Sequence, residues 1–495
     1  MGASMKILIL GHKLQYEIQN VTTAFHPGQK LETVYEKQPD WDVLTYLRAG
    51  RQNSYLLLLV KTESGILRSH RRVPNSGERY KQRCETAFGQ MLYTAYSGLT
   101  GVVPKWGILT GVRPVKNLQQ HMAAGCDEPA LRQLFCGDYK VTPEKFDLAY
   151  QTAIVQKQVL SPVDLRDVSL YVSIPFCPSR CLYCSFVSHS IEKSHKLVEP
   201  YLQLLLQEIT LTFDLIDKLG LHLKTVYIGG GTPTTLSAQQ MDRLLAAIFA
   251  RIHHPLEECT VEAGRPDTID LEKLQVMRRW PVTRVNINPQ TLSDQVLQNI
   301  GRRHSAAQTI ESFHQARQAG FDNINMDLIA GLPGDSYQGF CATLDRVLDL
   351  DPENITVHTL SVKRSADLKY SQMVRYSAQD LPVEAMLTYT VERLVGESGY
   401  RPYYMYRQKN TLSNLENVGY AKPGTEGLYN IYMMEELHTT IGCGAGSVTK
   451  MVDPRKNLIQ RSFNFKYPLE YTKNFSEICS RKHSLEVFYG DLFQV

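Results

Sequence analysis

Three closely spaced cysteines are the residues of this chain best suited to bind iron. Cys177, Cys181 and Cys184 follow the pattern C-x3-C-x2-C, directly after a short apolar run. Thiolates at this spacing can ligate three corners of a [4Fe–4S] cube. The fourth iron then has no protein ligand and is open to a small molecule. The spacing therefore predicts an iron–sulfur cluster with one exchangeable position.

The open iron of such a cluster can be chelated by the amino and carboxylate groups of S-adenosylmethionine (SAM). One electron then breaks the S–C5′ bond of SAM and releases a 5′-deoxyadenosyl radical, which abstracts hydrogen from unactivated carbon. The cofactors perform this chemistry, while the protein orients them and excludes water. The alternative interpretation is a zinc site. Zinc requires a fourth Cys or His close by, and the one nearby candidate, His189, fits the usual paired spacing poorly.

The composition of the chain is that of an ordinary soluble protein. Its 495 residues are 43% hydrophobic and 21% charged, a length that suggests two to four domains. The formal net charge of +4 gives no argument for nucleic acid as a partner. No apolar run reaches the ~20 residues of a transmembrane helix, and residues 56–60 are predicted to form a buried strand. We see no secretory signal, so the expected location is the cytoplasm.

The central part of the chain repeats a short apolar run, a turn and an amphipathic stretch. This alternation predicts βα units with a parallel sheet, and six units are too few for a closed eight-stranded barrel. A helix is predicted over 201–219, and capping boxes at Ser237 and Ser305 open two more. The predicted strands are 170–174, 225–228, 259–262, 284–288, 323–328 and 355–360.

The expected architecture is an α/β fold, a partial (β/α)6 barrel, with chemistry at the carboxyl ends of its strands. We expect three parts: an N-terminal α/β extension of unknown role over 1–160, the barrel over 165–380, and a C-terminal mixed α+β domain over 381–495. The extension has predicted strands at 5–10 and 54–60 and a helix at 79–97. The C-terminal part has a predicted helix at 383–397 and a strand at 403–406.

The cysteine loop and the motifs after it resemble those of the radical SAM superfamily. Residues 171–360 are similar to the oxygen-independent coproporphyrinogen III oxidase family, and the nearest overall resemblance is to its HemZ-type coproporphyrinogen dehydrogenases. That resemblance implies a [4Fe–4S] cluster on the three cysteines, which thereby become the catalytic residues, and a SAM site in the same barrel. Tyr183, between two cysteines, is expected to stack on adenine and shield the cluster. The other SAM-binding residues that the resemblance implies are Tyr171, Gly229, Gly230, Gly231, Thr232, Glu262, Gln290, Arg302 and Asp327.

The resemblance implies oxidative decarboxylation of two propionates of coproporphyrinogen III, giving protoporphyrinogen IX. The oxidases of this family have a fourth cysteine two residues after the third, where this chain has Phe186. Phe186 also occurs in relatives that resemble heme chaperones and heme-cleaving methyltransferases. Two alternatives therefore stay open: a heme-binding protein without decarboxylase activity, and a radical methyltransferase that opens the heme ring.

A tetrapyrrole partner with several carboxylates should meet cationic side chains, to which Arg is especially suited. Lys363 and Arg364, just after the sixth predicted strand, are candidates for this contact. The resemblance further implies a reduced flavodoxin- or ferredoxin-type electron donor.

Overall fold

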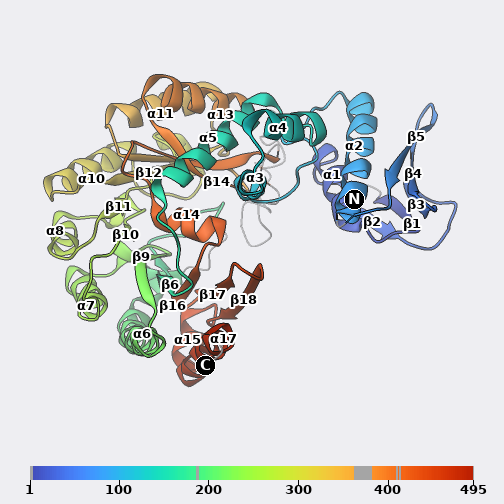
Figure 1. Cartoon of the computed structure of the whole chain (residues 1–495). Coiled ribbons are helices and arrows are strands. Elements are labelled where there is room, and N and C mark those ends of the chain that lie inside the picture. Colours follow the sequence, from blue (N-terminus) through green and yellow to red (C-terminus); the bar gives the residue numbers. More distant parts are fainter. Residues whose placement is uncertain are drawn as a thin grey trace. The chain divides into compact units, whose positions relative to one another are not determined.

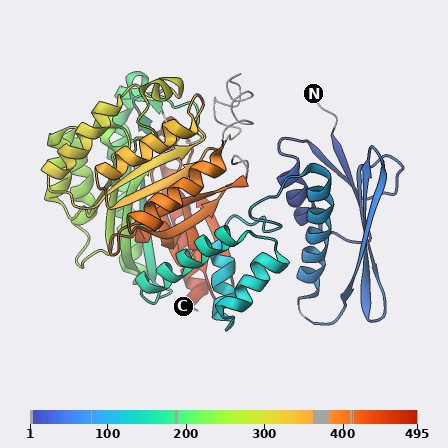
Figure 2. The same ribbon diagram turned by 90° about the horizontal axis from the view of Figure 1, so that it is seen from above.

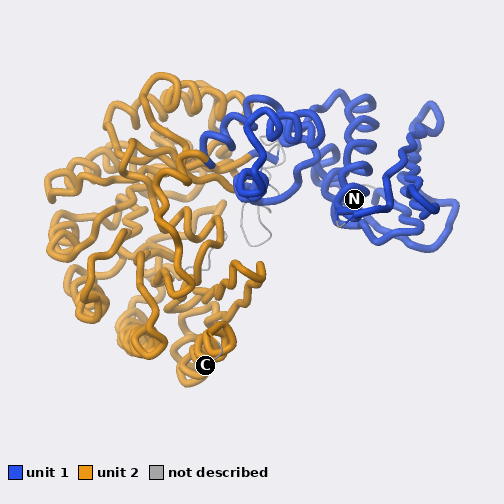
Figure 3. Tube along the Cα trace, in the orientation of Figure 1, with its two compact units in different colours: residues 1–153, 407–415 blue, residues 154–406, 416–495 orange. Residues whose placement is uncertain are grey.

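The computed structural model describes residues 4–77, 79–184, 189–361, 382–408, 411 and 414–493. Phe186, Lys363 and Arg364 lie outside this described part, so their predicted roles stay predictions. The chain divides into two compact units (Figure 3). Unit 1 contains residues 1–153 and 407–415, and unit 2 contains residues 154–406 and 416–495.

Unit 1 begins with a sheet that, within its described residues, has five strands in the order β2-β1-β3-β4-β5. β1 pairs in parallel with β2 and β3, whereas β4 pairs antiparallel with β3 and β5. Helices α1 and α2 cover one face of this sheet (Figure 2). The elements are β1 (Met5–Leu10), α1 (Gln15–Phe25), β2 (Leu31–Val34), β3 (Val43–Ala49), β4 (Asn53–Thr62), β5 (Gly65–Pro74) and α2 (Tyr80–Thr100).

The rest of unit 1 is helical and receives a segment from much later in the chain. Arg407 donates its main-chain N–H to the carbonyl of Val112 at 2.8 Å, and its guanidinium lies 5.4 Å from the ring centre of Trp106. These contacts explain why residues 407–415 belong to this unit. The helices are α3 (Pro114–Ala123), α4 (Glu128–Arg132), the π-helical turn Gln133–Asp138 and α5 (Pro143–Val159), whose residues from Ile154 onward belong to unit 2.

Unit 2 contains the predicted parallel sheet, whose six strands lie side by side in the order β13-β12-β11-β10-β9-β6. Every neighbouring pair among them is parallel. All six predicted strands are therefore confirmed, and the sheet is open, which confirms a partial barrel. The strands are β6 (Asp167–Ile174), β9 (His222–Gly230), β10 (Glu258–Glu262), β11 (Arg284–Asn286), β12 (Ile324–Ala330) and β13 (Asn354–Thr359).

The connecting helices follow the outer side of the curved sheet (Figure 1). The capping boxes at Ser237 and Ser305 are both formed with the glutamine three residues later. The predicted helix 201–219 begins earlier than expected, at Ile191, and continues through Pro200. The helices are α6 (Ile191–Leu219), α7 (Ala238–Phe249), α8 (Leu271–Arg279), α9 (Asp294–Asn299), α10 (Ala306–Gln318), α11 (Tyr337–Asp349) and α13 (Val383–Val391).

The C-terminal residues extend the same sheet at both of its edges, so that it has 11 strands in the described part of the chain. β15 pairs antiparallel with β13, and β16 pairs in parallel with β6. Helix α14 lies on the inner side of the sheet (Figure 1). The division into three domains stays a prediction. The elements are β14 (Arg401–Arg407), β15 (Glu416–Ala421), α14 (Leu428–Glu435), β16 (Thr439–Cys443), β17 (Val448–Asp453), β18 (Leu458–Phe463), α15 (Pro468–Lys473), α16 (Phe475–Lys482) and α17 (Ser484–Phe493).

Among the helices that the structure describes, none combines the length and the apolar character needed to cross a membrane.

Candidate active site

The cysteine loop leaves the carboxyl end of β6, where the sequence placed it. Cys177 lies in the short strand β7 (Phe176–Cys177), which pairs with β8 (His189–Ser190). Cys181 is buried, and the N–H of Cys184 donates to its carbonyl at 3.1 Å, forming a turn. None of the three cysteines forms a disulfide bond. Main-chain hydrogen bonds therefore hold the loop at Cys177 and at Cys184.

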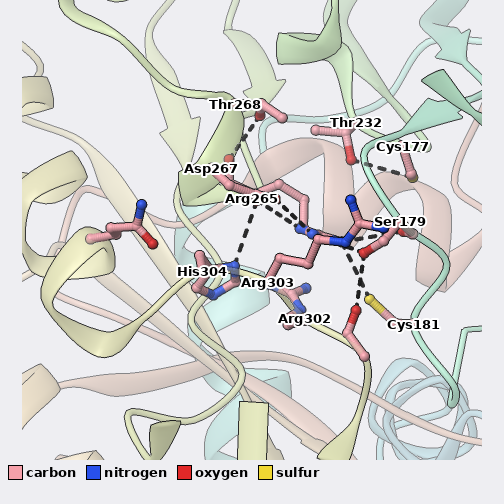
Figure 4. A network of polar contacts seen from close by, with 12 residues as sticks. Cys177, Ser179, Cys181, Thr232, Arg265, Asp267, Thr268, Arg302, Arg303 and His304 are labelled. Atoms are coloured by element: carbon pink, nitrogen blue, oxygen red, sulfur yellow. Dashed lines mark hydrogen bonds and ion pairs between the residues drawn. The ribbon is translucent and has the colours of Figure 1, made fainter. Parts of the chain in front are cut away.

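Two polar side chains contact the sulfurs of this loop (Figure 4). The hydroxyl of Thr232 donates to Sγ of Cys177 at 3.3 Å, and Nη1 of Arg265 lies 3.6 Å from Sγ of Cys181. Arg265 also donates to the carbonyl and the hydroxyl of Ser179, at 3.3 and 3.2 Å, and pairs with Asp267 at 2.8 Å. A guanidinium and a hydroxyl so placed favour anionic sulfur.

Arg265 is a site residue that the sequence analysis did not identify. It follows Glu262 closely in the segment after β10, and only the folded chain shows that it reaches the cysteine loop. The available signal was its position, because basic residues just after the strands of a parallel sheet lie at the edge where ligands bind.

The glycine segment 229–231 begins at the end of β9 and runs beside the cysteine loop. The N–H of Gly231 donates to the carbonyl of Ile174 at 2.8 Å, and the N–H of Thr232 donates to Phe176 at 2.7 Å. A Cβ at Gly231 would lie 2.7 Å from the Phe176 oxygen, and Gly230 has a left-handed φ of +105°. Side chains are thus excluded at both positions, and the backbone itself lines the site.

Arg302 joins the cysteine loop to the strand ends. Its Nη2 donates to the hydroxyl of Tyr183 at 3.1 Å, and its Nη1 donates to the carbonyls of Asn288 and Gly264 at 2.7 and 3.2 Å. Burial raises the pKa of Tyr183, so this phenol stays neutral. Tyr183 and Arg302 are therefore brought together directly.

Glu262 lies at the centre of a polar cluster on the inner side of the sheet. The amides of Asn286 and Asn288 each donate to its carboxylate at 3.0 Å, and the hydroxyl of Tyr227 also bonds to it. Burial, together with the nearby Asp327 carboxylate, raises the pKa of Glu262 to about 7. This carboxyl can therefore change protonation near neutral pH.

Tyr171 reaches this cluster through ring stacking. Its ring centre lies 6.1 Å from that of Tyr227, which stacks at 4.5 Å on Tyr429 of α14. These rings form an apolar wall beside Glu262, of the kind that lowers the local dielectric around a buried carboxyl.

Asp327 lies on β12 and pairs with a histidine that the sequence did not single out. Nδ2 of Asn325 donates to Asp327 at 2.7 Å, and Nε2 of His358 lies 3.6 Å from its other oxygen. Burial alone would raise the pKa of Asp327, but hydrogen bonding to His358 holds it below its ordinary value. The inner side of the sheet therefore carries a charged carboxylate close to the titrating Glu262.

Gln290 contributes main-chain bonds next to Asp327. Its N–H donates to the carbonyl of Asp327 at 2.9 Å, and its own carbonyl accepts from Ile329 at 3.0 Å. Its φ is +66°, an uncommon value for a residue other than glycine. The strained backbone is therefore fixed on β12, whereas the predicted SAM contact of its side chain stays a prediction.

The donor set fits an iron–sulfur cluster and a polar ligand. In the described part of the chain, no group of three or more His, Cys, Asp or Glu side chains lies close enough to hold a single metal ion. A cube places each thiolate on a different iron, so its ligands lie farther apart than those of one ion. Around Glu262, buried polar atoms without a hydrogen-bond partner are Asn286 Oδ1, Asn288 Oδ1 and Arg302 Nε. Ammonium or hydroxyl groups can satisfy the two oxygens.

Comparisons with known proteins agree with this geometry. The Radical SAM superfamily model matches residues 171–347. The oxygen-independent coproporphyrinogen-III oxidase-like protein HemZ of Bacillus subtilis (strain 168) is 35% identical over 95% of both chains. The heme chaperone HemW of the same bacterium is 33% identical, over 59% of this chain and 75% of its own.

Among solved structures, coproporphyrinogen III oxidase (HemN) from Escherichia coli, described as a radical SAM enzyme, superposes with a TM-score of 0.51. It is 25% identical, and the match covers 66% of this chain and 73% of that one. The fold, the motifs and the near full-length relative lead to one conclusion: this chain belongs to the radical SAM superfamily, in the oxygen-independent coproporphyrinogen III oxidase-like family that includes HemZ.

Proposed function

We propose that the protein carries out the oxygen-independent oxidative decarboxylation of coproporphyrinogen III to protoporphyrinogen IX. The observation that carries this proposal is a continuous polar network from the cysteine loop to the inner side of the sheet. It runs from Tyr183 through Arg302 and Asn288 to Glu262, in hydrogen bonds of 2.7 to 3.1 Å. This network connects the predicted cluster loop with Glu262, the carboxylate that the resemblance assigns to SAM.

Membership of the superfamily implies a [4Fe–4S] cluster and SAM, which together supply hydrogen-atom abstraction from unactivated carbon. Cys177, Cys181 and Cys184 would hold the cluster. Thr232 and Arg265 would stabilise its negative charge through the contacts at the sulfurs. Glu262, Asn286 and Asn288 offer acceptors for the ammonium and ribose groups of SAM, and segment 229–231 lets them approach the backbone closely.

The reaction would balance when each propionate loses one hydrogen atom to the adenosyl group derived from SAM, one molecule of carbon dioxide, and one electron to a one-electron acceptor, leaving a vinyl group. A reduced flavodoxin- or ferredoxin-type protein would supply the electron that starts each turnover. The full-length similarity to HemZ, whose name refers to the oxidase, supports this reaction. Lys363 and Arg364 stay candidates for binding the propionates.

The test is anaerobic reconstitution of the cluster, followed by SAM, reductant and coproporphyrinogen III. We expect a product lighter by two carboxyl groups and two hydrogen atoms, and one 5′-deoxyadenosine per vinyl group formed. The matched control is Cys181→Ala, which should lose iron, colour and product together. An intact substrate despite SAM cleavage by a fully loaded enzyme would contradict the proposal.

Heme chaperoning is the second candidate, and the 33% identity to HemW favours it. It predicts tight binding of heme and its transfer to an apoprotein, with no loss of carboxyl groups from coproporphyrinogen III. The reconstituted protein distinguishes the two functions when both assays are run on one preparation.

A further inference from the structure

The sheet of unit 1 has one face that its described helices leave open. In β4 the residues Leu56, Leu58 and Val60 point into the core under α1 and α2. Leu57 and Leu59 point the opposite way, because neighbouring residues of a strand alternate between faces. They are only partly buried, and Figure 2 shows no helix over that face. A strand that is apolar on both faces is typical of a sheet that is covered on both sides.

The strand register places the residues of the open face in three cross-strand rows. Tyr46 is 37% exposed and Tyr55 is 44% exposed, which is high for such large rings. Each row ends at the edge strand β5 in a basic residue or a histidine. The rows are Leu8–Leu44–Leu59–Arg68, Leu10–Tyr46–Leu57–His70 and Arg48–Tyr55–Arg72, of which Leu8 is already buried.

The charges within these three rows have one sign, whereas the same face continues to Lys6, which lies opposite Glu32 and pairs with Asp40. The three rows contain Arg48, Arg68 and Arg72 and no Asp or Glu. The guanidinium of Arg72 lies 5.4 Å from the ring centre of Tyr55, so one side of that ring is already next to a cation. An apolar, aromatic centre bordered by guanidinium groups suits a ligand that is flat, apolar in its middle and anionic at its edge.

The three rows have the dimensions of a flat ligand. Four strands about 4.8 Å apart and three rows about 6.6 Å apart give a patch of roughly 14 by 13 Å. This is about 180 Å² between backbone positions, and β4 and β5 continue the same face by one row at each end, Asn53–Pro74 and Lys61–Ile66. The three rows match the face of one porphyrin-sized ring.

We propose that this face is a binding site for a tetrapyrrole carrying several carboxylates. The ring would lie on Tyr46, Leu57 and Tyr55. Its carboxylates would pair with Arg68 and Arg72 on one side and Arg48 on the other. This proposal rests on the proposed function for the choice of tetrapyrrole, and it adds a second place for that molecule in a unit without the three cysteines.

The test uses coproporphyrin III, a stable fluorescent tetracarboxylate, titrated into the full-length protein. We expect Arg68→Glu/Arg72→Glu to weaken binding at this site at least tenfold, so that one bound coproporphyrin per chain is lost at concentrations that saturate the wild type. Tyr46→Ser should weaken it severalfold while leaving every charge in place. The matched control is Lys30→Glu, a charge reversal at an exposed residue of the same unit, which should bind as the wild type does.

The variants must keep their circular dichroism and their SAM cleavage without substrate, since the altered residues are exposed and belong to the other unit. Unchanged coproporphyrin binding in both variants would overturn the proposal. A second contrary outcome is that the variants bind coproporphyrin normally but lose activity with flavodoxin as the electron donor and keep it with dithionite. The face would then be a docking site for an acidic protein. A change of oligomeric state at unchanged binding would likewise overturn it and indicate contact between two copies.

The same samples separate the two proposals. If the wild type decarboxylates coproporphyrinogen III and the variants bind and turn over equally well, the decarboxylase stands and the unit 1 site is wrong. If the wild type binds coproporphyrin through Arg68 and Arg72 but removes no carboxyl group, the site stands and the decarboxylase is wrong.

Discussion

Arg265 places Nη1 3.6 Å from the sulfur of Cys181, although 84 residues separate them in the chain. Its other contacts, to Ser179 and Asp267, hold the guanidinium in this position. A fixed cation at a predicted cluster ligand stabilises negative charge on the sulfur. This makes Arg265 a positioning residue whose effect on the cluster is measurable.

Replacing Arg265 by Gln should destabilise the cluster without unfolding the chain. A hydrogen bond to a charged group contributes about 1.5–3 kcal/mol, so we expect iron to be lost to a chelator about tenfold faster. The midpoint potential should also fall, because removing a cation disfavours the more negative, reduced cluster. Iron release and redox titration followed by electron paramagnetic resonance measure both effects.

The control for Arg265→Gln is Arg303→Gln. Arg303 is exposed and pairs with Glu192 at the surface, so its loss should change neither quantity. Equal potentials and equal iron release in the two variants would show that the contact of Arg265 with Cys181 has no effect on the cluster.

Replacing Gly231 by Ala should disturb the cysteine loop through its backbone contact with the glycine segment 229–231. The added Cβ would lie 2.7 Å from the Phe176 oxygen and 2.9 Å from the Ile174 oxygen. Both neighbours are backbone, so the segment must shift, at a cost of about 1–3 kcal/mol. We expect a lower melting temperature together with incomplete iron loading, measured on the same preparation.

Gly98→Ala is the matched control, because Gly98 lies within α2 and an added Cβ would meet nothing within 4 Å. It should raise stability by about 0.5–1 kcal/mol through helix propensity. A Gly231→Ala protein as stable and as rich in iron as the wild type would mean that this close approach is not needed.

Much of the barrel could be predicted because its signals are local. The alternation of apolar runs and helices gave all six parallel strands, and the capping boxes at Ser237 and Ser305 depend only on residues three apart. The contact of Arg265 with Cys181 could not be predicted, because it joins two loops that approach each other only in the folded sheet.

Local sequence patterns could not predict which strands lie at the edges of the sheet either. β16 pairs with β6, although about 270 residues separate them in the chain. Neither strand carries a sequence signal that identifies the other as its partner. His358 was missed for a related reason: it reaches Asp327 only because β13 and β12 are adjacent. The roles of the predicted SAM-binding residues depend on the bound molecule and stay predictions.

Glu262 predicts a specific dependence of stability on pH. Its pKa in the folded chain, about 7, is above its ordinary value of 4.5. The folded chain therefore holds this proton more tightly than the unfolded chain does, so the contribution favours folding at low pH and is lost as pH rises from about 4.5 through 7. Between these two limits, the contribution of Glu262 to the free energy of unfolding changes by as much as about 3 kcal/mol.

Glu262→Gln replaces the carboxyl by an amide that does not titrate, so this contribution to the pH dependence of stability is lost. Its melting temperature should fall less than that of the wild type between pH 5 and pH 8, as followed by circular dichroism. Glu257, on the loop before β10, is partly exposed, and Glu257→Gln serves as the control that should keep the wild-type slope. Parallel curves for the wild type and Glu262→Gln would place the pKa of Glu262 near its ordinary value.

A buried ion pair between Glu208 and Lys482 holds the C-terminal helix α16 against α6. Lys482 of α16 lies 3.1 Å from the carboxylate of Glu208 on α6, and both side chains are almost fully buried. Glu208 also accepts from the N–H of Gly444 and the hydroxyl of Tyr471, each at 2.7 Å. The pair thus connects two helices to the glycine turn after β16.

Lys482→Met should leave the Glu208 carboxylate buried without its cation, a change that typically costs about 3–5 kcal/mol. Urea unfolding at pH 7 should show this loss as a lower midpoint. The double variant Glu208→Gln/Lys482→Met removes both charges and should recover a large part of the stability, since a neutral amide can still serve Gly444 and Tyr471. A double variant no more stable than Lys482→Met would show that the packing of the lysine, and not its charge, holds α16 in place.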